Sequence, residues 1–302
     1  MAPILEVRNL VKNYGSTAAV KGVSFNIEEG EIFSLLGPNG AGKTTTISVL
    51  STLLAPTSGD VRVGGHSVVS EPMKVRNLIG VVPQEIALYD DLTAHENLIF
   101  WGQMYNLSGK TLTDRVQQVL QEIELADRAK DRVRTFSGGM KRRVNIGVGL
   151  LHRPRLLFMD EPTVGIDPQS RRAILDSVKA LNRQGMTVLY TTHYMEEAQE
   201  LSDRVGIIDH GELIALGTQN ELTRQVGEND ALVLEVGEGE NVRQLCEAAK
   251  SIPGVVESDT SGSTLTIIAP EAEEILAPVI VQANALNVKI HSVAIQEPNL
   301  EA

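Results

Sequence analysis

Eight consecutive residues place glycines, a lysine and a hydroxyl group in the spacing G-x-x-x-x-G-K-S/T: Gly37, Pro38, Asn39, Gly40, Ala41, Gly42, Lys43 and Thr44. They follow a predicted strand over Glu31–Leu36 and open a predicted helix over Lys43–Leu54. Such glycines let backbone N–H groups curl around phosphate oxygens, and the helix start adds its dipole. We expect ATP here, with Lys43 on the β- and γ-phosphates, Thr44 on Mg²⁺ and Thr45 beside them.

Two carboxylates follow a second buried run. Leu156–Met159 is apolar enough for a strand buried on both faces, and Asp160 and Glu161 come directly after it. In P-loop NTPases an aspartate in this position holds the Mg²⁺ shell. Glu161 is then positioned to orient and polarise the attacking water. A carboxylate pair is weak evidence alone, but after a phosphate loop the catalytic reading is favoured.

These motifs make residues 4–225 resemble the ATP-binding subunits of ABC transporters. Phe136-Ser137-Gly138-Gly139-Met140 is similar to the family signature LSGGQ, with Phe and Met replacing Leu and Gln. The resemblance implies that Ser137, Gly138 and Gly139 of one chain close over ATP on the P-loop of a second copy, in a head-to-tail dimer with two composite sites. Ser137 is also a good helix N-cap, and both roles are compatible.

Four further segments match the family pattern. Tyr14 resembles the aromatic residue that stacks on adenine, and Gln84 the glutamine that contacts Mg²⁺ or the water and couples to the permease. Gly165–Asp167 resembles the segment that contacts the partner subunit, and His193 the histidine on the γ-phosphate. Taken alone, these residues would be interpreted as a packing tyrosine, a loop glutamine, a helix cap before Pro168 and a structural histidine. The basic run Lys141–Arg143 is predicted to be a solvated helix face.

Within the family, the chain resembles the drug-resistance or daunorubicin-type exporters. The similarity rests on Thr191–Ala198 (TTHYMEEA), on Asp209-His210-Gly211 and on the presence of a small C-terminal domain. The stretch Pro298–Ala302 is similar to a proline-x-leucine-glutamate segment found in that branch.

The arrangement of predicted elements indicates a mixed α/β protein with two domains. Residues 1–228 are predicted to form a P-loop NTPase core of ABC type, with a hairpin at Asp60–Val68 and a helical subdomain inserted at about 85–152. Residues 229–302 show the order strand, helix, strand, strand, helix, strand, which is the ferredoxin-like α+β arrangement.

Composition narrows the classes of partner. Of the net charge of −12, residues 229–302 contribute −9, from 12 acidic and 3 basic side chains, which argues against nucleic acid. No run approaches the roughly 18 apolar residues of a membrane span, and residues 1–6 lack a signal peptide. We therefore expect a cytoplasmic chain held at the inner face of the membrane by a separate permease. Cys246 is the sole cysteine and is predicted to be an inert buried thiol.

The sequence predicts an ATPase that dimerises on MgATP and drives export through that permease. One alternative is an ABC-type ATPase with a role in translation or repair, but such proteins usually carry two nucleotide domains or a long coiled-coil insertion. Another is a regulatory module that binds nucleotide without hydrolysing it. Intact Lys43, Asp160 and Glu161 disfavour that alternative.

Overall fold

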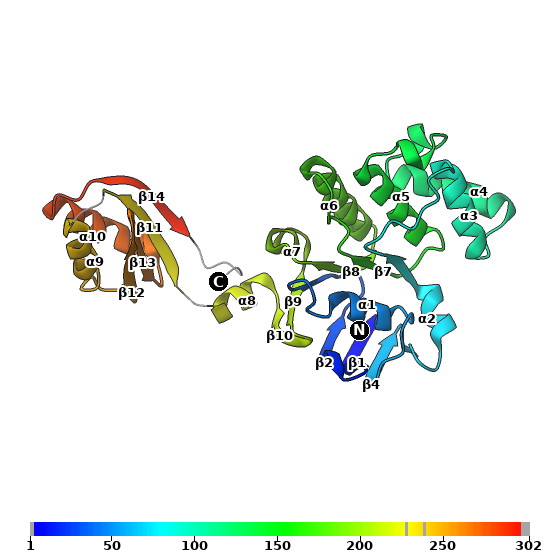
Figure 1. The fold of residues 1–302 in the computed structure, drawn as a ribbon, viewed down its shortest axis with the longest axis horizontal. Coiled ribbons are helices and arrows are strands. Elements are labelled where there is room, and N and C mark those ends of the chain that lie inside the picture. The colour runs from blue at the N-terminus through cyan, green and yellow to red at the C-terminus, as the bar shows by residue number, and fades with distance from the viewer. Residues whose placement is uncertain (1–2, 227–228, 238–239, 297–302) are drawn as a thin grey trace. The chain divides into compact units, whose positions relative to one another are not determined.

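The computed structural model describes residues 3–226, 229–237 and 240–296. By its internal contacts the chain divides into two units, Met1–Gln219 and Asn220–Ala302, whose elements are labelled in Figure 1. The boundary predicted between residues 228 and 229 falls partly outside the described residues and stays a prediction. The segment Pro298–Ala302 also lies outside them.

A six-stranded sheet forms the centre of the first unit. Its order is β10-β9-β3-β8-β7-β6, and all neighbours are parallel except β10 and β9. Every residue of β3, β7 and β8 is buried, as expected for parallel strands covered on both faces. The loops after these three strands therefore meet at one edge of the sheet. The strands are β3 (Ile32–Leu36), β6 (Ile79–Val82), β7 (Leu156–Asp160), β8 (Thr187–Thr192), β9 (Arg204–Asp209) and β10 (Glu212–Gly217).

A second sheet, antiparallel and four-stranded, shares a hydrophobic core with one face of the first. Its order is β2-β1-β4-β5, with β1 (Leu5–Tyr14), β2 (Thr17–Ile27), β4 (Ser58–Val63) and β5 (His66–Ser67). The predicted hairpin is confirmed, because Gly64 and Gly65 take φ of 55° and 81° between the paired residues Val63 and His66. Helix α1 (Lys43–Leu50) contributes to the same core through Ile47, Val49 and Leu50.

Helices cover the other face of the central sheet. Between β6 and β7 the chain forms α3 (Ala94–Met104), α4 (Gly109–Glu122) and α5 (Gly138–Leu150), with two short 3-10 turns and an isolated bridge from Thr93 to Arg132. α6 (Pro168–Arg183) and α7 (Met195–Leu201) follow β7 and β8 on this face, whereas α2 (Pro72–Leu78), which precedes β6, packs through Val75 into the core shared by the two sheets. The predicted cap of α6 is confirmed: the Asp167 carboxylate accepts the Ser170 N–H at 2.9 Å, and Pro168 is the first helical residue.

The second unit contains the predicted βαββαβ order after a first helix, α8 (Gln219–Val226). The elements are β11 (Asp230–Val236), α9 (Glu240–Ala249), β12 (Glu257–Ser261), β13 (Thr264–Ala269), α10 (Ala272–Ala285) and β14 (Ile290–Gln296). They form an antiparallel sheet of order β12-β13-β11-β14 with its own core. Cys246 on α9 is buried in that core, with Sγ 3.3 Å from the hydroxyl of Ser258 on β12.

None of the helices in the described ranges has the length and hydropathy that crossing a bilayer requires.

Candidate nucleotide site

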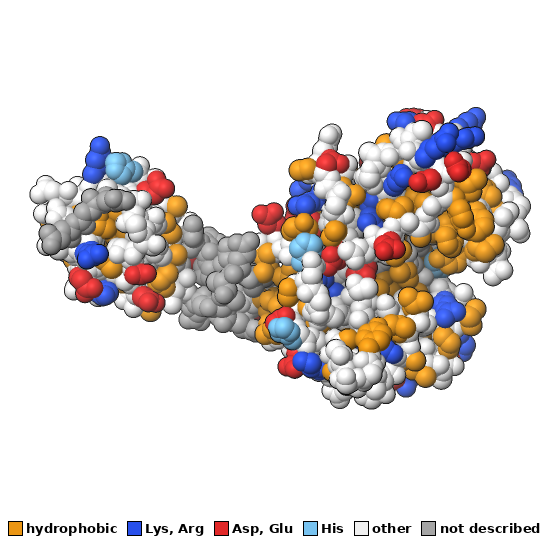
Figure 2. All heavy atoms as spheres, viewed as in Figure 1, with side chains coloured by type: hydrophobic (Ala, Val, Ile, Leu, Met, Phe, Trp, Pro, Cys, Tyr) orange, Lys and Arg blue, Asp and Glu red, His pale blue; other side chains and the backbone are white. Residues whose placement is uncertain are grey.

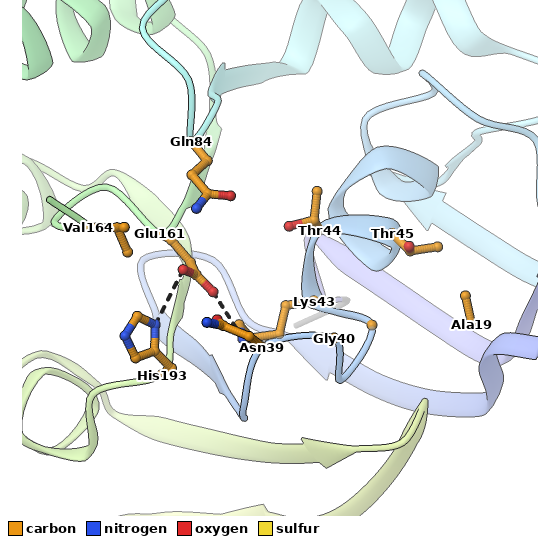
Figure 3. A pocket seen from close by; sticks show the side chains of 11 residues that line it. Ala19, Asn39, Gly40, Lys43, Thr44, Thr45, Gln84, Glu161, Val164 and His193 are labelled. Carbon is orange, nitrogen blue, oxygen red and sulfur yellow. Dashed lines mark hydrogen bonds and ion pairs between the residues drawn. The ribbon is translucent and has the colours of Figure 1, made fainter.

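A hollow of about 350 Å³ opens where the loops after β3, β6, β7 and β8 converge. Figure 3 shows Gln84, Glu161 and His193 on one side of it and Thr44 and Thr45 on the other. The loop predicted to bind phosphate thus faces the predicted catalytic residues, although His193 lies 150 positions after Lys43 in the sequence. The lining residues are Ala19, Asn39, Gly40, Gly42, Lys43, Thr44, Thr45, Gln84, Glu161, Val164 and His193.

The loop between β3 and α1 has a shape that only glycine permits at two positions. Gly42 has φ of 106°, and a Cβ there would lie 2.6 Å from the carbonyl oxygen of Ala19. A Cβ at Gly37 would lie 2.1 Å from the carbonyl oxygen of Ile208. Because the loop curls so tightly, its backbone N–H groups and the start of α1 form a cradle suited to phosphate. Gly37, Pro38 and Ala41 shape this loop without lining the hollow.

Lys43 lies at the base of the hollow and is 4% exposed. Its ammonium donates to the carbonyl oxygens of Gly37 at 2.6 Å and Pro38 at 2.8 Å. It also pairs with Glu161, Nζ to Oε1, at 3.0 Å. The carbonyl oxygens of the loop therefore hold the Lys43 ammonium where it can bind a phosphate anion.

Glu161 connects the cradle to His193. Its second carboxylate oxygen lies 3.3 Å from His193 Nδ1, while the first pairs with Lys43. The backbone of Glu161 has a φ of 44°, which is strained for a residue other than glycine. Its N–H donates to the Thr191 hydroxyl at 3.0 Å, which stabilises this turn at the end of β7. Strained backbone of this kind is typical of functional sites, where it aims a side chain that relaxed geometry would turn away.

Asp160 and Thr44 supply oxygen atoms suited to Mg²⁺. Asp160 is 5% exposed, and burial raises the pKa of its carboxyl above the usual range. Hydrogen bonds from Thr191, at 2.8 Å, and from Thr44 oppose this rise in pKa. Mg²⁺ is usually held by one or two carboxylates together with substrate phosphates, so this sparse set of protein ligands fits the ion. In the described part of the chain no group of three or more His, Cys, Asp or Glu side chains forms a metal cluster.

Gln84 is held at the hollow by a residue that the sequence prediction placed in solvent. Arg142 is 3% exposed and donates to the carbonyl oxygens of Pro83 at 2.7 Å and Gln84 at 2.6 Å. The prediction of a solvated Lys141–Arg143 face is therefore wrong for Arg142, because this turn of α5 packs against the loop after β6. Lys141 and Arg143 are partly exposed, as predicted.

The signature residues do not line this hollow. Ser137 caps α5 by accepting the Met140 N–H at 3.2 Å, which confirms the predicted cap. A Cβ at Gly139 would lie 2.3 Å from the side chain of Ser170, so this glycine lets α5 and α6 approach closely within one chain. The contact of Ser137, Gly138 and Gly139 with a second chain's nucleotide stays a prediction.

Tyr14 also lies outside the residues that line the hollow. It is 49% exposed at the end of β1, and Lys12 Nζ lies 5.5 Å from its ring centroid. An exposed ring is free to stack on a base, and that role stays a prediction.

Thr191 is a residue that the sequence analysis passed over: its hydroxyl accepts from Glu161 and donates to Asp160. The only signal was a hydroxyl at the end of a buried strand.

Comparison with known proteins identifies the class. Residues 20–164 match the model of the ABC transporter family. The chain is 50% identical to the linearmycin resistance ATP-binding protein LnrL of Bacillus subtilis (strain 168), over 99% of this chain and 96% of the relative. It is 38% identical to the doxorubicin resistance ATP-binding protein DrrA of Mycobacterium tuberculosis (strain ATCC 25618 / H37Rv), over 98% and 90%.

Solved structures agree with this family. An ATP-binding subunit of an ABC transporter superposes with a TM-score of 0.66 at 32% identity, covering 74% of this chain and 92% of the other. A dimeric ATP-binding cassette in a post-hydrolysis state, bound to ADP and Pi, gives 0.63 at 30% identity, covering 71% and 98%.

The chain belongs to the ATP-binding subunits of ABC transporters. The predicted fold of the core and the predicted ATPase activity are confirmed by these matches. The exporter interpretation is also confirmed, because the relatives include resistance proteins and a Nod factor export ATP-binding protein of Ralstonia nicotianae (strain ATCC BAA-1114 / GMI1000). The alternative of an ATPase without a transport role is not favoured.

Proposed function

We propose that this chain binds MgATP in the hollow and hydrolyses it with Glu161 and His193, as one of two identical subunits that power a separate membrane permease. The observation that carries the proposal is the unbroken line of contacts from Lys43 through Glu161 to His193 at the edge of a phosphate-binding loop. Because the loops follow different strands and meet at one edge of the sheet, the triphosphate of one ATP can contact all of them at once.

The residues of this chain divide the work as follows. The loop N–H groups and Lys43 bind the phosphates, and entry of the γ-phosphate draws the Lys43 ammonium from Glu161. Glu161 then accepts hydrogen bonds from the attacking water and orients it in line with the γ-phosphorus. His193 holds Glu161 on one side and donates to the γ-phosphate on the other. Mg²⁺, held by Thr44, Gln84 and Asp160, would neutralise charge on the β- and γ-phosphates.

A second copy completes the site in this proposal. Ser137 and the start of α5 present a second helix N-terminus suited to an anion, and they do not line the hollow of their own chain. If two chains meet head to tail, this N-terminus in each covers the γ-phosphate of the other. The relative solved as a dimer with ADP and Pi supports such an arrangement.

The helical part of the first unit is the surface that we assign to the permease. Figure 2 shows hydrophobic side chains gathered over this region, and Tyr89 and Met104 are 48% and 60% exposed. Tyr89 lies five residues after Gln84, so contact there is transmitted to the nucleotide site through a short loop. The chain would then work at the inner face of the membrane, as expected from the sequence.

The test measures turnover of the purified chain as its concentration is varied. A composite site requires that turnover per chain rises with protein concentration at saturating MgATP and reaches a plateau, and that chelation of Mg²⁺ abolishes it. Turnover independent of concentration in a chain that stays monomeric in ATP contradicts the dimer. Reconstitution in vesicles with a candidate permease then tests transport, because ATP supplied on the side of the ATPase should move substrate to the opposite side of the membrane.

A further inference from the structure

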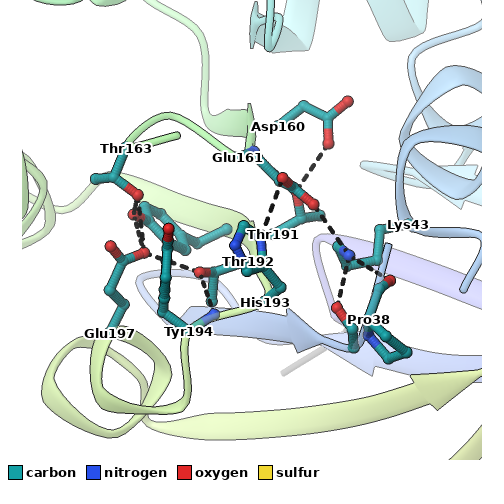
Figure 4. A network of polar contacts seen from close by, with 12 residues as sticks. Pro38, Lys43, Asp160, Glu161, Thr163, Thr191, Thr192, His193, Tyr194 and Glu197 are labelled. Atoms are coloured by element: carbon teal, nitrogen blue, oxygen red, sulfur yellow. Dashed lines mark hydrogen bonds and ion pairs between the residues drawn. The ribbon is translucent and has the colours of Figure 1, made fainter. Parts of the chain in front are cut away.

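A buried carboxylate beside the site receives three hydroxyl groups from two segments, the loop after β7 and strand β8. Glu197, in the first turn of α7, is 3% exposed. Its Oε2 accepts from Thr163 at 3.0 Å, Tyr190 at 2.9 Å and Thr192 at 2.8 Å. Figure 4 shows these contacts beside the Lys43–Glu161–His193 line. A carboxylate suits this position, because it accepts hydrogen bonds from several hydroxyl groups more strongly than a neutral amide oxygen does.

Two of these hydroxyls belong to the segments that carry Glu161 and His193. Thr163 lies two residues after Glu161 in a tight turn. The Val164 N–H closes this turn by donating to the Glu161 carbonyl at 3.3 Å. Thr192 directly precedes His193, and its hydroxyl also accepts the Tyr194 N–H at 2.9 Å. Glu197 is therefore hydrogen-bonded to the segment that carries Glu161 and to the segment that carries His193, and the side chains of these two residues lie 3.3 Å apart.

The other oxygen of Glu197 faces a cation. Arg171 Nε lies 3.5 Å from Oε1, and neither atom has a hydrogen-bond partner among the described residues. The guanidinium of Arg171 also stacks on the ring of Tyr194, 4.4 Å from its centroid. Since Arg171 is in the first turn of α6, it adds the segment after Asp167 to the same cluster. Burial, together with the negative charge of Glu197, raises the pKa of Tyr190 well above its usual value, so that this hydroxyl stays a donor.

We propose that Glu197 is a positioning residue that sets the separation between Glu161 and His193, and so fixes the orientation of the water that Glu161 polarises. The inference rests on the proposed function of those two residues. Glu197 is buried and does not line the hollow, so we expect it to touch neither the nucleotide nor the attacking water. Its effect on catalysis therefore passes through His193 and Glu161, and this route makes it distinguishable from a general contribution to stability.

The test compares Glu197→Gln with Glu196→Gln. Both remove one charge from adjacent positions of α7, but Glu196 is exposed and Glu197 is buried. The amide keeps the shape of Glu197, although a neutral oxygen holds three hydroxyls less firmly and the NH₂ group faces Arg171. We expect kcat to fall about tenfold in Glu197→Gln, with KM for ATP changed less than about twofold, and Glu196→Gln to match the parent.

A second pair of variants shows whether the effect passes through His193. In single-turnover measurements, His193→Ala and His193→Ala/Glu197→Gln should differ by less than about twofold, because the contact between Glu161 and His193 that Glu197 sets is already gone. Equal kcat in Glu197→Gln and the parent overturns the inference, and so does a full tenfold loss in the His193→Ala background. If Glu197→Gln does not fold, Tyr190→Phe decides, since it removes one of the three donors at nearly constant volume. A parent chain without MgATP hydrolysis overturns the proposed function itself, and the inference with it.

Discussion

Glu161 joins the contacts of Lys43 and His193 in the hollow. One of its oxygens pairs with Lys43 and the other contacts His193, and its strained backbone is stabilised by Thr191. In this arrangement the carboxylate is held by the same lysine that would otherwise meet the phosphates. In the proposed mechanism the side chain is placed before ATP arrives, and ATP binding exchanges its partner without moving the backbone that carries it.

The first residue-scale prediction is that Glu161→Gln binds MgATP with near-parental affinity and hydrolyses it more slowly by about two orders of magnitude or more. The amide retains the shape but cannot polarise water as a carboxylate does. Steady-state turnover and size measured in ATP check this, because the variant should accumulate as an ATP-bound dimer. Near-parental turnover would contradict the assignment of Glu161.

The second concerns binding itself. Lys43→Ala removes the cation that pairs with the β- and γ-phosphates, so affinity for ATP should fall by about tenfold or more. Titration with a fluorescent ATP analogue measures it, and Lys74→Ala is the control, because Lys74 is exposed on α2 and does not line the hollow. Unchanged affinity and unchanged hydrolysis together would rule out the phosphate-binding role of the loop.

The sequence revealed the residues whose chemistry forces a local pattern. A loop that wraps phosphate this tightly needs glycine at positions such as Gly37 and Gly42. In the same way, the buried strand that ends at Asp160 and is followed by Glu161 shows as an apolar run before two carboxylates. No local sequence pattern marks Arg142, Thr191 or Glu197, because each contacts a residue that is distant in the sequence. Arg142 carries a charge in a basic run that resembles a solvated face, and only the packing of α5 shows that its guanidinium is buried. Their roles depend on tertiary structure that spacing alone does not encode.

At the scale of elements, α5 joins two functional regions. Its first residues are the signature, capped by Ser137, and its second turn carries Arg142, which donates to the carbonyl oxygens of Pro83 and Gln84. In the proposed dimer this helix therefore touches the partner's nucleotide at one end and its own glutamine loop further along. A helix is stiff enough over two turns to transmit a small displacement between those points.

The prediction at this scale is that Ser137→Arg abolishes cooperative hydrolysis while leaving nucleotide binding to the P-loop intact. The arginine fills the space where the partner's γ-phosphate docks. Because any substitution also removes the helix cap, at a cost of about 1 kcal/mol, Ser137→Ala serves as the control for lost stability. Turnover and thermal unfolding of both variants separate the two effects.

Mixing Ser137→Arg with Lys43→Ala sharpens the test. A mixed dimer contains one composite site with both defects and one with neither, so part of the parental turnover should return. Absence of any recovery, in mixtures shown to form dimers, would contradict a site built from two chains.

For the whole molecule, the division into two cores suggests a division of labour. All the contacts described at the hollow come from the first unit, and the second has a separate ferredoxin-like core and most of the negative charge. The βαββαβ order was predictable because its strands and helices alternate in pattern over short distances. Its position relative to the first unit is not encoded in that pattern. We propose that it modulates dimer geometry or permease engagement and performs no chemistry.

The corresponding prediction is that a chain ending at Glu228 folds and binds MgATP with near-parental affinity. Its turnover, or the salt dependence of its dimerisation, should change, since a net charge of −9 is removed from each copy. Expression yield, nucleotide affinity and turnover check this. Aggregation would indicate that residues 229–302 only cover apolar surface, and loss of ATP binding in a well-folded truncation would place part of the nucleotide site beyond residue 228.

The single cysteine has a practical consequence. Cys246 is buried between α9 and β12, where the Ser258 hydroxyl also donates to the Cys246 carbonyl at 2.7 Å. A thiol reagent reaches the sulfur only when α9 separates from the strand, so the rate of modification measures how often this small core opens. The rate of Cys246 modification therefore reports on opening of the accessory unit in the parental sequence, with no introduced label. That rate can be compared before and after the addition of ATP, of a second copy or of the permease.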